Sequence, residues 1–371
     1  MQDKTIKRNI FSLFVIIMIS TIPVTGLPVK LGQDAWISLL LAIIPVFPLL
    51  VIYSRSTKLM PERDIFGMAE RLFGKIGAGI AGFLFFIYFI YMTSFIIYSF
   101  TELIHLTSLF KTPMFIIMII LILAAVYLAR SGLETMAKWA FVMLIVISLT
   151  LILTSLASVN FMDFGKLFPV MEHYPKDIIK GSFKLVSYPF GEAVILLIIL
   201  APLKGDNLKP FKISILGIFT AAFFISIFLL RTITVLGPEL ADSSLFAVYK
   251  ATSIVKVGNY LQRLGSAIEF IYVLAGMVKI AVYLYAAGQA VSRFVGIGGR
   301  KAVVPVGVAG IVLSLLLFGN NLHIFDFYRN FIVFSIPFQI IIPVFIWIWA
   351  EIKLRRPKTL NKEVGVAQNR D

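Results

Sequence analysis

Ten stretches of this chain are each apolar over about 20 residues, the length that a helix needs to cross the hydrocarbon core of a bilayer. Inside a bilayer each backbone N–H and C=O has to be paired without water, so stretches of this kind fold as helices. The apolar runs lie at about 9–30, 35–54, 77–103, 113–130, 136–158, 181–203, 211–235, 262–292, 302–319 and 328–350. The sequence therefore predicts an all-α integral membrane protein with about ten transmembrane helices.

Composition supports this fold class and excludes several functions. Charged residues make up 14% of the 371 residues and hydrophobic residues 59%, whereas soluble domains carry about 25% charged residues. The net charge of +15 is distributed between the apolar runs, so it does not form the clustered patch that a nucleic-acid site needs. The chain has no cysteine, and its three histidines are too scattered for a metal site. We expect no enzyme activity, no cofactor, no metal and no nucleic acid.

The placement of Lys and Arg predicts the orientation of the spans. With the N-terminus inside, about 22 of these residues fall in inner segments and about 11 in outer ones, which is the bias of cytoplasmic loops. Both termini are therefore expected in the cytoplasm, with one transmembrane domain over 1–351 and a polar cytoplasmic tail over 352–371. The run from Asn9 lacks a small-x-small cleavage site, so we interpret it as a retained first helix. Short amphipathic helices are expected near 61–75 and 244–255.

Two spans carry residues that interrupt a helix. The first contains Pro23, Gly26 and Pro28, and the sixth contains Pro189 and Gly191. Proline removes a backbone donor and glycine relaxes the backbone. The first and sixth of ten spans are equivalent members of two five-helix halves, here about 9–158 and 181–350, which run with opposite topology because five is odd. Paired breaks in such an inverted repeat predict a binding site near the middle of the membrane, although Pro and Gly are also common in membrane helices generally.

Ionisable residues inside the spans are a second indication of function. Glu192 lies near the centre of the sixth span, and Glu269 and Lys279 lie in the eighth. Each costs about 2.5–3.5 kcal/mol at the middle of a bilayer, so each should face protein or water. Glu269 and Lys279 are ten residues apart on different faces of one helix, which makes a pair between them unfavourable. Lys279 could pair with Glu192 across the bundle; alternatively, each side chain bonds a backbone carbonyl or reaches the interface.

Tyrosines form polar stripes on two otherwise apolar spans. In the third span Tyr91 and Tyr98 share one face with Ser94, Thr101 and Glu102, and such a face usually contacts protein or a cavity. Anchoring at the membrane interface explains Tyr98 and Glu102 almost as well. The eighth span repeats the pattern with three tyrosines, one of which is Tyr283. The candidate ligand-binding residues are Thr21, Pro23, Thr25, Gly26, Tyr91, Tyr98, Pro189, Gly191, Glu192, Lys279 and Tyr283.

Several strings resemble the spore germination permeases, the B subunits of nutrient germinant receptors. The stretch Gly32–Ser38 (GQDAWIS) is similar to a signature of that family, and so are the segments from Gly237 to Glu269 and from Gly276 to Ala287. The resemblance implies membership of the amino acid–polyamine–cation transporter group, with a five-plus-five inverted repeat. It also implies a nutrient sensor in the spore inner membrane that works beside an A-type subunit and a lipoprotein C-type subunit. Transporters of the group often carry Gly-Ser-Gly at the first break, where this chain has Val24-Thr25-Gly26.

These observations lead to one functional expectation with two rivals. We expect a membrane subunit that binds a small germinant, an amino acid, between the first, third, sixth and eighth spans and triggers germination. Its amino group would meet carbonyls near Pro23 and Pro189 together with Glu192, and its carboxylate would meet amides near Thr25 and Gly26. One rival is a proton-coupled amino acid transporter in which Glu192 or Lys279 titrates. The other is a structural membrane partner whose pocket is vestigial.

Overall fold

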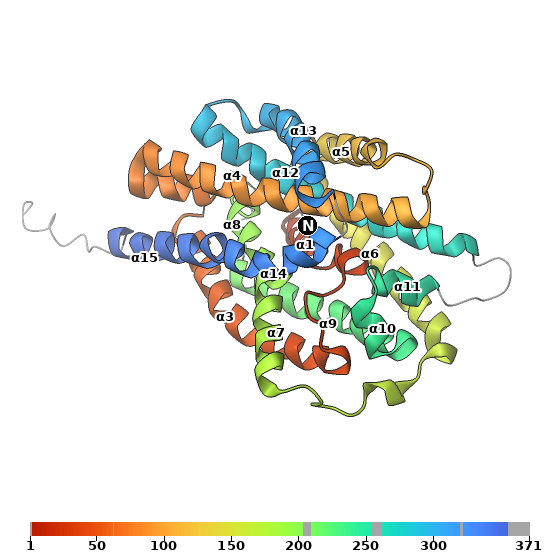
Figure 1. Ribbon diagram of the computed structural model, residues 1–371. Helices are drawn as coiled ribbons and strands as arrows, with labels where there is room; N and C mark the ends of the chain where they lie inside the picture. Colours follow the sequence, from red (N-terminus) through yellow and green to blue (C-terminus); the bar gives the residue numbers. More distant parts are fainter. Residues whose placement is uncertain (1, 62, 203–208, 254–261, 320–321, 355–371) are drawn as a thin grey trace, which may run out of the picture.

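A computed structural model describes residues 2–61, 63–202, 209–253, 262–319 and 322–354, and every regular element among them is a helix (Figure 1). The α-helices are α1 (Gln2–Ile19), α2 (Ile22–Thr25), α3 (Ala35–Leu59), α4 (Ile65–Thr107), α5 (Met114–Arg130), α6 (Leu133–Ser158), α7 (Pro175–Ser187), α8 (Leu196–Ile199), α9 (Pro210–Leu236), α10 (Pro238–Ser243), α11 (Ala247–Ser253), α12 (Gln262–Val295), α13 (Gly299–Phe318), α14 (Leu322–Ile336) and α15 (Ile342–Leu354). Short 3-10 turns are η1 (Gly32–Asp34), η2 (Val159–Phe161), η3 (Phe164–Leu167) and η4 (Phe190–Ile195), and η5 (Pro337–Ile341) is a π turn.

The predicted spans are present in the described part of the chain. Nine helical stretches there are long and apolar enough to cross a membrane, and α5, a shorter apolar helix of 17 residues, supplies the tenth. The protein is thus an all-α integral membrane protein with about ten transmembrane helices. The last span ends at Leu354, so most of the predicted tail, residues 355–371, lies outside the described residues.

The third span differs most from its prediction, because α4 begins at Ile65 and not near 77. The Asp64 side chain caps the helix by accepting a 2.7 Å hydrogen bond from the Gly67 amide. The first turns form the short helix expected near 61–75, and they join the span through a kink at Gly74, whose φ is 74°. The short helix expected near 244–255 is also present as α11, with residues 254–261 outside the described part.

Four spans form the centre of the bundle. In the most apolar part of the first and sixth spans, 89% of the residues are buried, and in the third and eighth spans the share is 67%. In the other five long spans it is 28–39%. The long helices α4 and α12 run side by side, with α5 and α13 against them (Figure 1). Helix α3 packs on α7 and α9, and α1 is enclosed by α6, α9 and α12. The two spans predicted to be broken therefore lie away from lipid, where backbone breaks are tolerated.

Candidate ligand-binding site

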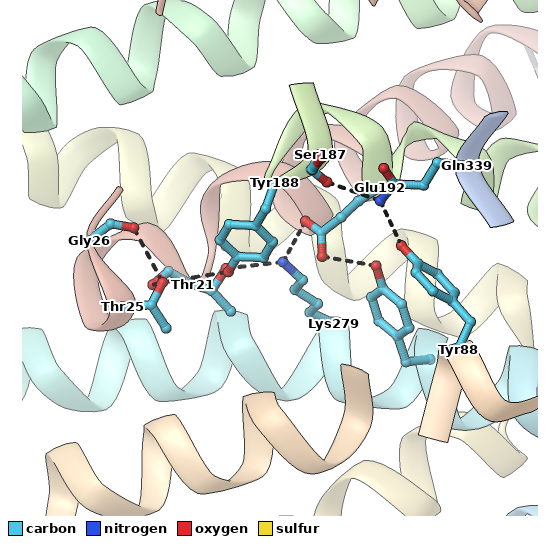
Figure 2. A network of polar contacts seen from close by, with 10 residues as sticks. Thr21, Thr25, Gly26, Tyr88, Ser187, Tyr188, Glu192, Lys279 and Gln339 are labelled. Atoms are coloured by element: carbon cyan, nitrogen blue, oxygen red, sulfur yellow. Dashed lines mark hydrogen bonds and ion pairs between the residues drawn. The ribbon is translucent and has the colours of Figure 1, made fainter. Parts of the chain in front are cut away.

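The first span breaks one helical turn before its end. Helix α1 ends at Ile19, a turn follows at Ser20 and Thr21, and α2 then continues to Thr25. Gly26 closes α2 with φ 67°, a left-handed conformation that favours glycine. All four residues of α2 are buried. The predicted break is thus present, and it turns the Thr21 side chain toward the middle of the bundle (Figure 2).

The sixth span breaks in a corresponding place. Helix α7 ends at Ser187, Tyr188 is extended (φ −148°, ψ 121°), and Pro189 precedes the 3-10 turn η4. A 3-10 turn is tighter than an α-helix and pairs its backbone differently. Glu192 lies within η4, and its side chain is fully buried. The broken segment therefore places a carboxylate at the same level as Thr21.

An ion pair joins this carboxylate to the eighth span (Figure 2). Lys279 Nζ of α12 donates to Glu192 Oε2 at 2.7 Å and to Thr21 Oγ1 at 3.0 Å. Tyr283, one turn further along the same face of α12, donates its hydroxyl to Glu192 Oε1 at 2.9 Å. The Tyr188 hydroxyl is hydrogen-bonded to that of Thr21, and its ring centroid lies 5.0 Å from Lys279 Nζ. Three spans thus meet at one polar centre.

A second group of hydrogen bonds connects the broken sixth span to the tenth span. Gln339 Nε2, in η5, donates to the Ser187 carbonyl at 2.9 Å and to the Tyr88 hydroxyl of α4 at 3.0 Å. The Tyr53 hydroxyl of α3 donates to the Gln339 carbonyl. A Cβ added to Gly191 would collide with the Gln339 side chain, so this close approach requires glycine. These hydrogen bonds hold the end of α7 against α4 and η5.

The polar centre is costly to build. Glu192 and Lys279 are both completely buried, and removing two charges from water costs several kcal/mol for each ion, which their attraction only partly returns. The residues around them supply further hydrogen bonds, but an apolar pair of similar size would often be as stable or more so. A charged pair at the break of a central span is therefore better explained by function than by stability.

A cavity of about 300 Å³ reaches the first break from one end of the bundle. Thr25 and Gly26 lie in its wall, one turn from Thr21. The rest of the wall comes from α7, α9, α10, α11, η1 and the loops beside them. It includes Lys30, Gly32, Lys184, Thr232, Asp242, Ser244, Ile225, Leu229, Leu245 and Val248. Glu192 and Lys279 are not in the wall and lie beyond α2.

Asp242 and the residues around it shape the mouth of this cavity. Asp242 Oδ2 accepts a hydrogen bond of 2.8 Å from the Gly32 amide, which joins α10 to η1. Burial raises the pKa of the Asp242 carboxyl, and the Gly32 hydrogen bond and the nearby charges of Lys30 and His173 oppose that rise. Asp34 in turn accepts hydrogen bonds from the Met171 and His173 amides at 2.7 and 2.9 Å. The GQD string thus ties two loops to the start of the second span.

The structure brings some of the predicted site residues together and separates others. Thr21, Glu192, Lys279 and Tyr283 share the polar centre, and the possible pair between Glu192 and Lys279 is present. The backbone breaks contain Pro23, Thr25, Gly26, Pro189 and Gly191. Tyr91 and Tyr98 lie elsewhere, because their rings pack against phenylalanines of α13 and α14; Phe318 contacts both at 5.9 Å between ring centroids.

The sequence predicts that a ligand carboxylate meets amides near Thr25 and Gly26. The amides of these two residues themselves already donate to the carbonyls of Thr21 and Ile22, at 2.8 and 2.9 Å. A short helical turn satisfies its own last amides, so these donors are not available to a ligand. The Lys279 ammonium has three N–H donors, and Glu192 and Thr21 accept two of them, which leaves the third for an anionic group.

Several residues of the site are absent from the sequence prediction. Tyr188 and Gln339 join the network although a tyrosine beside a proline and a single glutamine in an apolar run are weak signals. Tyr88 belongs to the tyrosine-rich third span but not to the predicted site. Arg231 is the clearest omission, because a charge within an apolar run is a strong signal. It is 2% exposed and donates to Thr154 Oγ1 and, at 2.7 Å, to Thr252 Oγ1, which holds α11 over the cavity.

Comparison with known proteins identifies the family of this chain. A family model described as "Spore germination protein" matches residues 5–322, which include both breaks and the three spans that meet at the Glu192–Lys279 pair. The chain belongs to the spore germination protein family. Membership in this family also agrees with the resemblance carried by the GQDAWIS string.

Relatives with the same family description extend over most of the chain. The putative spore germination protein YfkT of Bacillus subtilis (strain 168) is 26% identical over 85% of this chain and 87% of its own length. Spore germination protein KB of the same organism is 24% identical, with 88% of each chain covered. Spore germination protein XB of Bacillus anthracis is 24% identical over 63% of this chain and 64% of its own. The protein is therefore a germination-related, multi-pass membrane protein.

Proposed function

We propose that this germination protein is the ligand-binding membrane subunit of a nutrient germinant receptor, and that its ligand is a small amino acid. The observation that carries the proposal is the fully buried Glu192–Lys279 pair between the breaks of the first and sixth spans. Each charge has an opposite counterpart in a zwitterion: the Lys279 ammonium matches an α-carboxylate, and the Glu192 carboxylate matches an α-ammonium.

The cavity beside α2 supports a route for such a ligand. Its volume of about 300 Å³ is at the lower end of the range for small-molecule pockets, which suits an amino acid better than a larger nutrient. Ile22 and Thr25 in its wall belong to α2, which directly follows Thr21 of the polar centre. We infer that the ligand enters here and that movement of α2 opens the way to Lys279, since α2 has only four residues and is joined through a glycine.

The proposal extends to membrane and partners. We infer that the protein lies in the spore inner membrane with both termini in the cytoplasm, as the Lys and Arg distribution favours. We also infer that it assembles with A-type and C-type receptor subunits in a lipid environment. Membership of the germination family and the signature at the start of the second span support this assignment.

Thermal unfolding of the purified protein against a panel of amino acids tests the binding proposal. A ligand at 100 times its Kd stabilises the protein that binds it by about 2.7 kcal/mol. Tyr283→Phe removes the hydroxyl that donates to Glu192 at 2.9 Å and leaves the ring in place, so it should weaken this stabilisation. Tyr285→Phe, on the same helix but half-buried, is the matched control and should respond like the wild type. Equal responses of both variants would remove the polar centre from the binding site.

A proton-coupled amino acid transporter is the second candidate, and the same ion pair favours it. Transfer of one proton from Lys279 to Glu192 across their 2.7 Å hydrogen bond would leave both groups neutral, a change that a transport cycle can couple to movement of the broken helices. Uptake of labelled amino acid into proteoliposomes separates the two functions, because a receptor subunit binds without accumulating its ligand. Amino acids that neither stabilise the protein nor are taken up would favour the structural-partner interpretation.

A further inference from the structure

A groove of about 530 Å³ lies between the amino-terminal ends of α1 and α9. Four of the seven residues that line it are basic, namely Lys7, Arg8, Lys209 and Lys212, and the other three are Phe11, Ile213 and Leu216. We refer to these seven residues as the basic groove. Arg8, Lys209 and Lys212 are exposed, and Leu216 is 48% exposed. The groove therefore joins a cluster of cations to an apolar strip along two spans.

Three cations of the basic groove, Arg8, Lys209 and Lys212, are exposed, and the lining around them differs from that of a neighbouring cavity. A second cavity at the same end of the bundle, of about 420 Å³, is lined by Arg63, Asp64, Glu70 and Arg293. There, Arg293 pairs with Asp64 at 3.2 Å and with Glu70 at 3.3 Å. Among the described residues, no acidic side chain lines the basic groove. Like charges held close together repel one another, and a bound anion relieves that repulsion. Arg8, Lys209 and Lys212 are therefore suited to an anionic ligand.

The geometry of the groove selects among anions. Its cations lie where α1 and α9 begin, and its apolar residues follow one to two turns into the spans. That order, charged at the edge and apolar further in, matches a lipid with its phosphate at the membrane surface and its chains along the helices. The Arg8 guanidinium lies 3.8 Å from the centroid of the Phe141 ring of α6, which positions one of the donors.

We propose that the basic groove is a binding site for an anionic phospholipid, with the phosphodiester held by Lys209, Lys212 and Arg8 and the acyl chains along Phe11 and Leu216. A phosphate group forms strong charge-assisted hydrogen bonds with lysine and arginine. The site is separate from the polar centre and does not depend on the function proposed for it. A bound lipid would bridge α1, which carries the first break, to α9, which forms part of the cavity wall.

Lipid titrations of the purified full-length protein in detergent test this site. Phosphatidylglycerol should raise the thermal unfolding temperature in a saturable manner, and phosphatidylcholine with the same acyl chains should not. The double variant Lys209→Gln/Lys212→Gln should weaken the apparent phosphatidylglycerol affinity about 25-fold, from the contribution of two basic residues near a membrane surface. Lys176→Gln/Lys180→Gln removes two exposed lysines from α7 and should leave the affinity unchanged.

Two further arms distinguish a bound lipid from free phosphate and from a folding defect. Millimolar inorganic phosphate should neither stabilise the protein nor displace the lipid; equal protection by phosphate alone would overturn the assignment to a lipid. Lys212→Gln alone should give an intermediate affinity. Because it is a milder change, and because gel filtration checks that it is monodisperse, it shows whether the loss in the double variant comes from a folding defect. Equal losses in the groove and α7 variants, or equal stabilisation by both lipids, would overturn the site itself.

Discussion

Breaking the Glu192–Lys279 pair from either side should destabilise the protein far more than removing both charges. In Glu192→Gln, the Lys279 ammonium loses its counterion and keeps neutral partners alone: the amide oxygen of the new glutamine, the Thr21 hydroxyl at 3.0 Å and the ring of Tyr188 at 5.0 Å. In Lys279→Met, the Glu192 carboxylate keeps only the Tyr283 hydroxyl at 2.9 Å. Each single variant thus leaves a charge that is completely buried and without its counterion. The double variant leaves no buried charge there.

The expected magnitudes follow from that difference. Removing one partner of a buried pair costs about 3–5 kcal/mol, whereas replacing both partners is often close to neutral. Each single variant should therefore lower the ratio of folded to unfolded protein by between about a hundredfold and a few thousandfold. The double variant should return to within about 1 kcal/mol of the wild type. Arg55→Gln breaks a pair with Glu351 in which the arginine is 43% exposed, and it should cost far less stability than either single variant because solvent screens the pair.

Reversible unfolding by SDS in mixed micelles, followed by tryptophan fluorescence, measures these free energies as a double-mutant cycle. The amino acid that stabilises the wild type is then added to each variant. All three variants at the polar centre should lose ligand-induced stabilisation, including the double variant with near-normal stability. Costs that simply add in the double variant would refute the coupling. A double variant that still responds to ligand would show that the pair does not take part in binding.

Gly191→Ala should lower the amount of folded protein, because its Cβ would displace the Gln339 side chain; immunoblots of membrane fractions measure this, and normal levels would mean that the turn has room to move. Single cysteines in place of Lys58 and Ser243, both exposed at opposite ends of the bundle, should be labelled from the cytoplasmic and the outer face, respectively, and labelling from the same face would exclude the ten-span topology. Because burial raises the pKa of Asp242, the folded state binds this proton more tightly than the unfolded chain. The stability of the wild type relative to Asp242→Asn should therefore rise as the pH falls through that raised pKa, and parallel pH profiles in SDS titrations would contradict this.

Part of the candidate site could be predicted because single residues, recognisable from their position in the sequence, indicate it. Pro23, Gly26, Pro189 and Gly191 interrupt a helix wherever that helix packs, so the breaks in the first and sixth spans could be read from single positions. Glu192 and Lys279 stand out in apolar runs because a charge at the middle of a bilayer costs free energy and usually marks a functional site. The same rule should have indicated Arg231, which is 2% exposed within the seventh span.

The sequence by itself determined that the chain forms about ten helices in a membrane, because backbone pairing without water permits no other fold for long apolar runs. It also determined where two of them break. Only the tertiary structure decided which side chains meet, since helical periodicity defines the faces of each helix but not the neighbour that each face contacts. Tyr91 and Tyr98 thus shared a predicted polar face yet pack on Phe318, while Tyr188 and Gln339 entered the polar network through a break and a π turn that rotate their side chains inward. The contact between Lys279 and Glu192, 87 residues apart, depends on how α12 packs beside the sixth span.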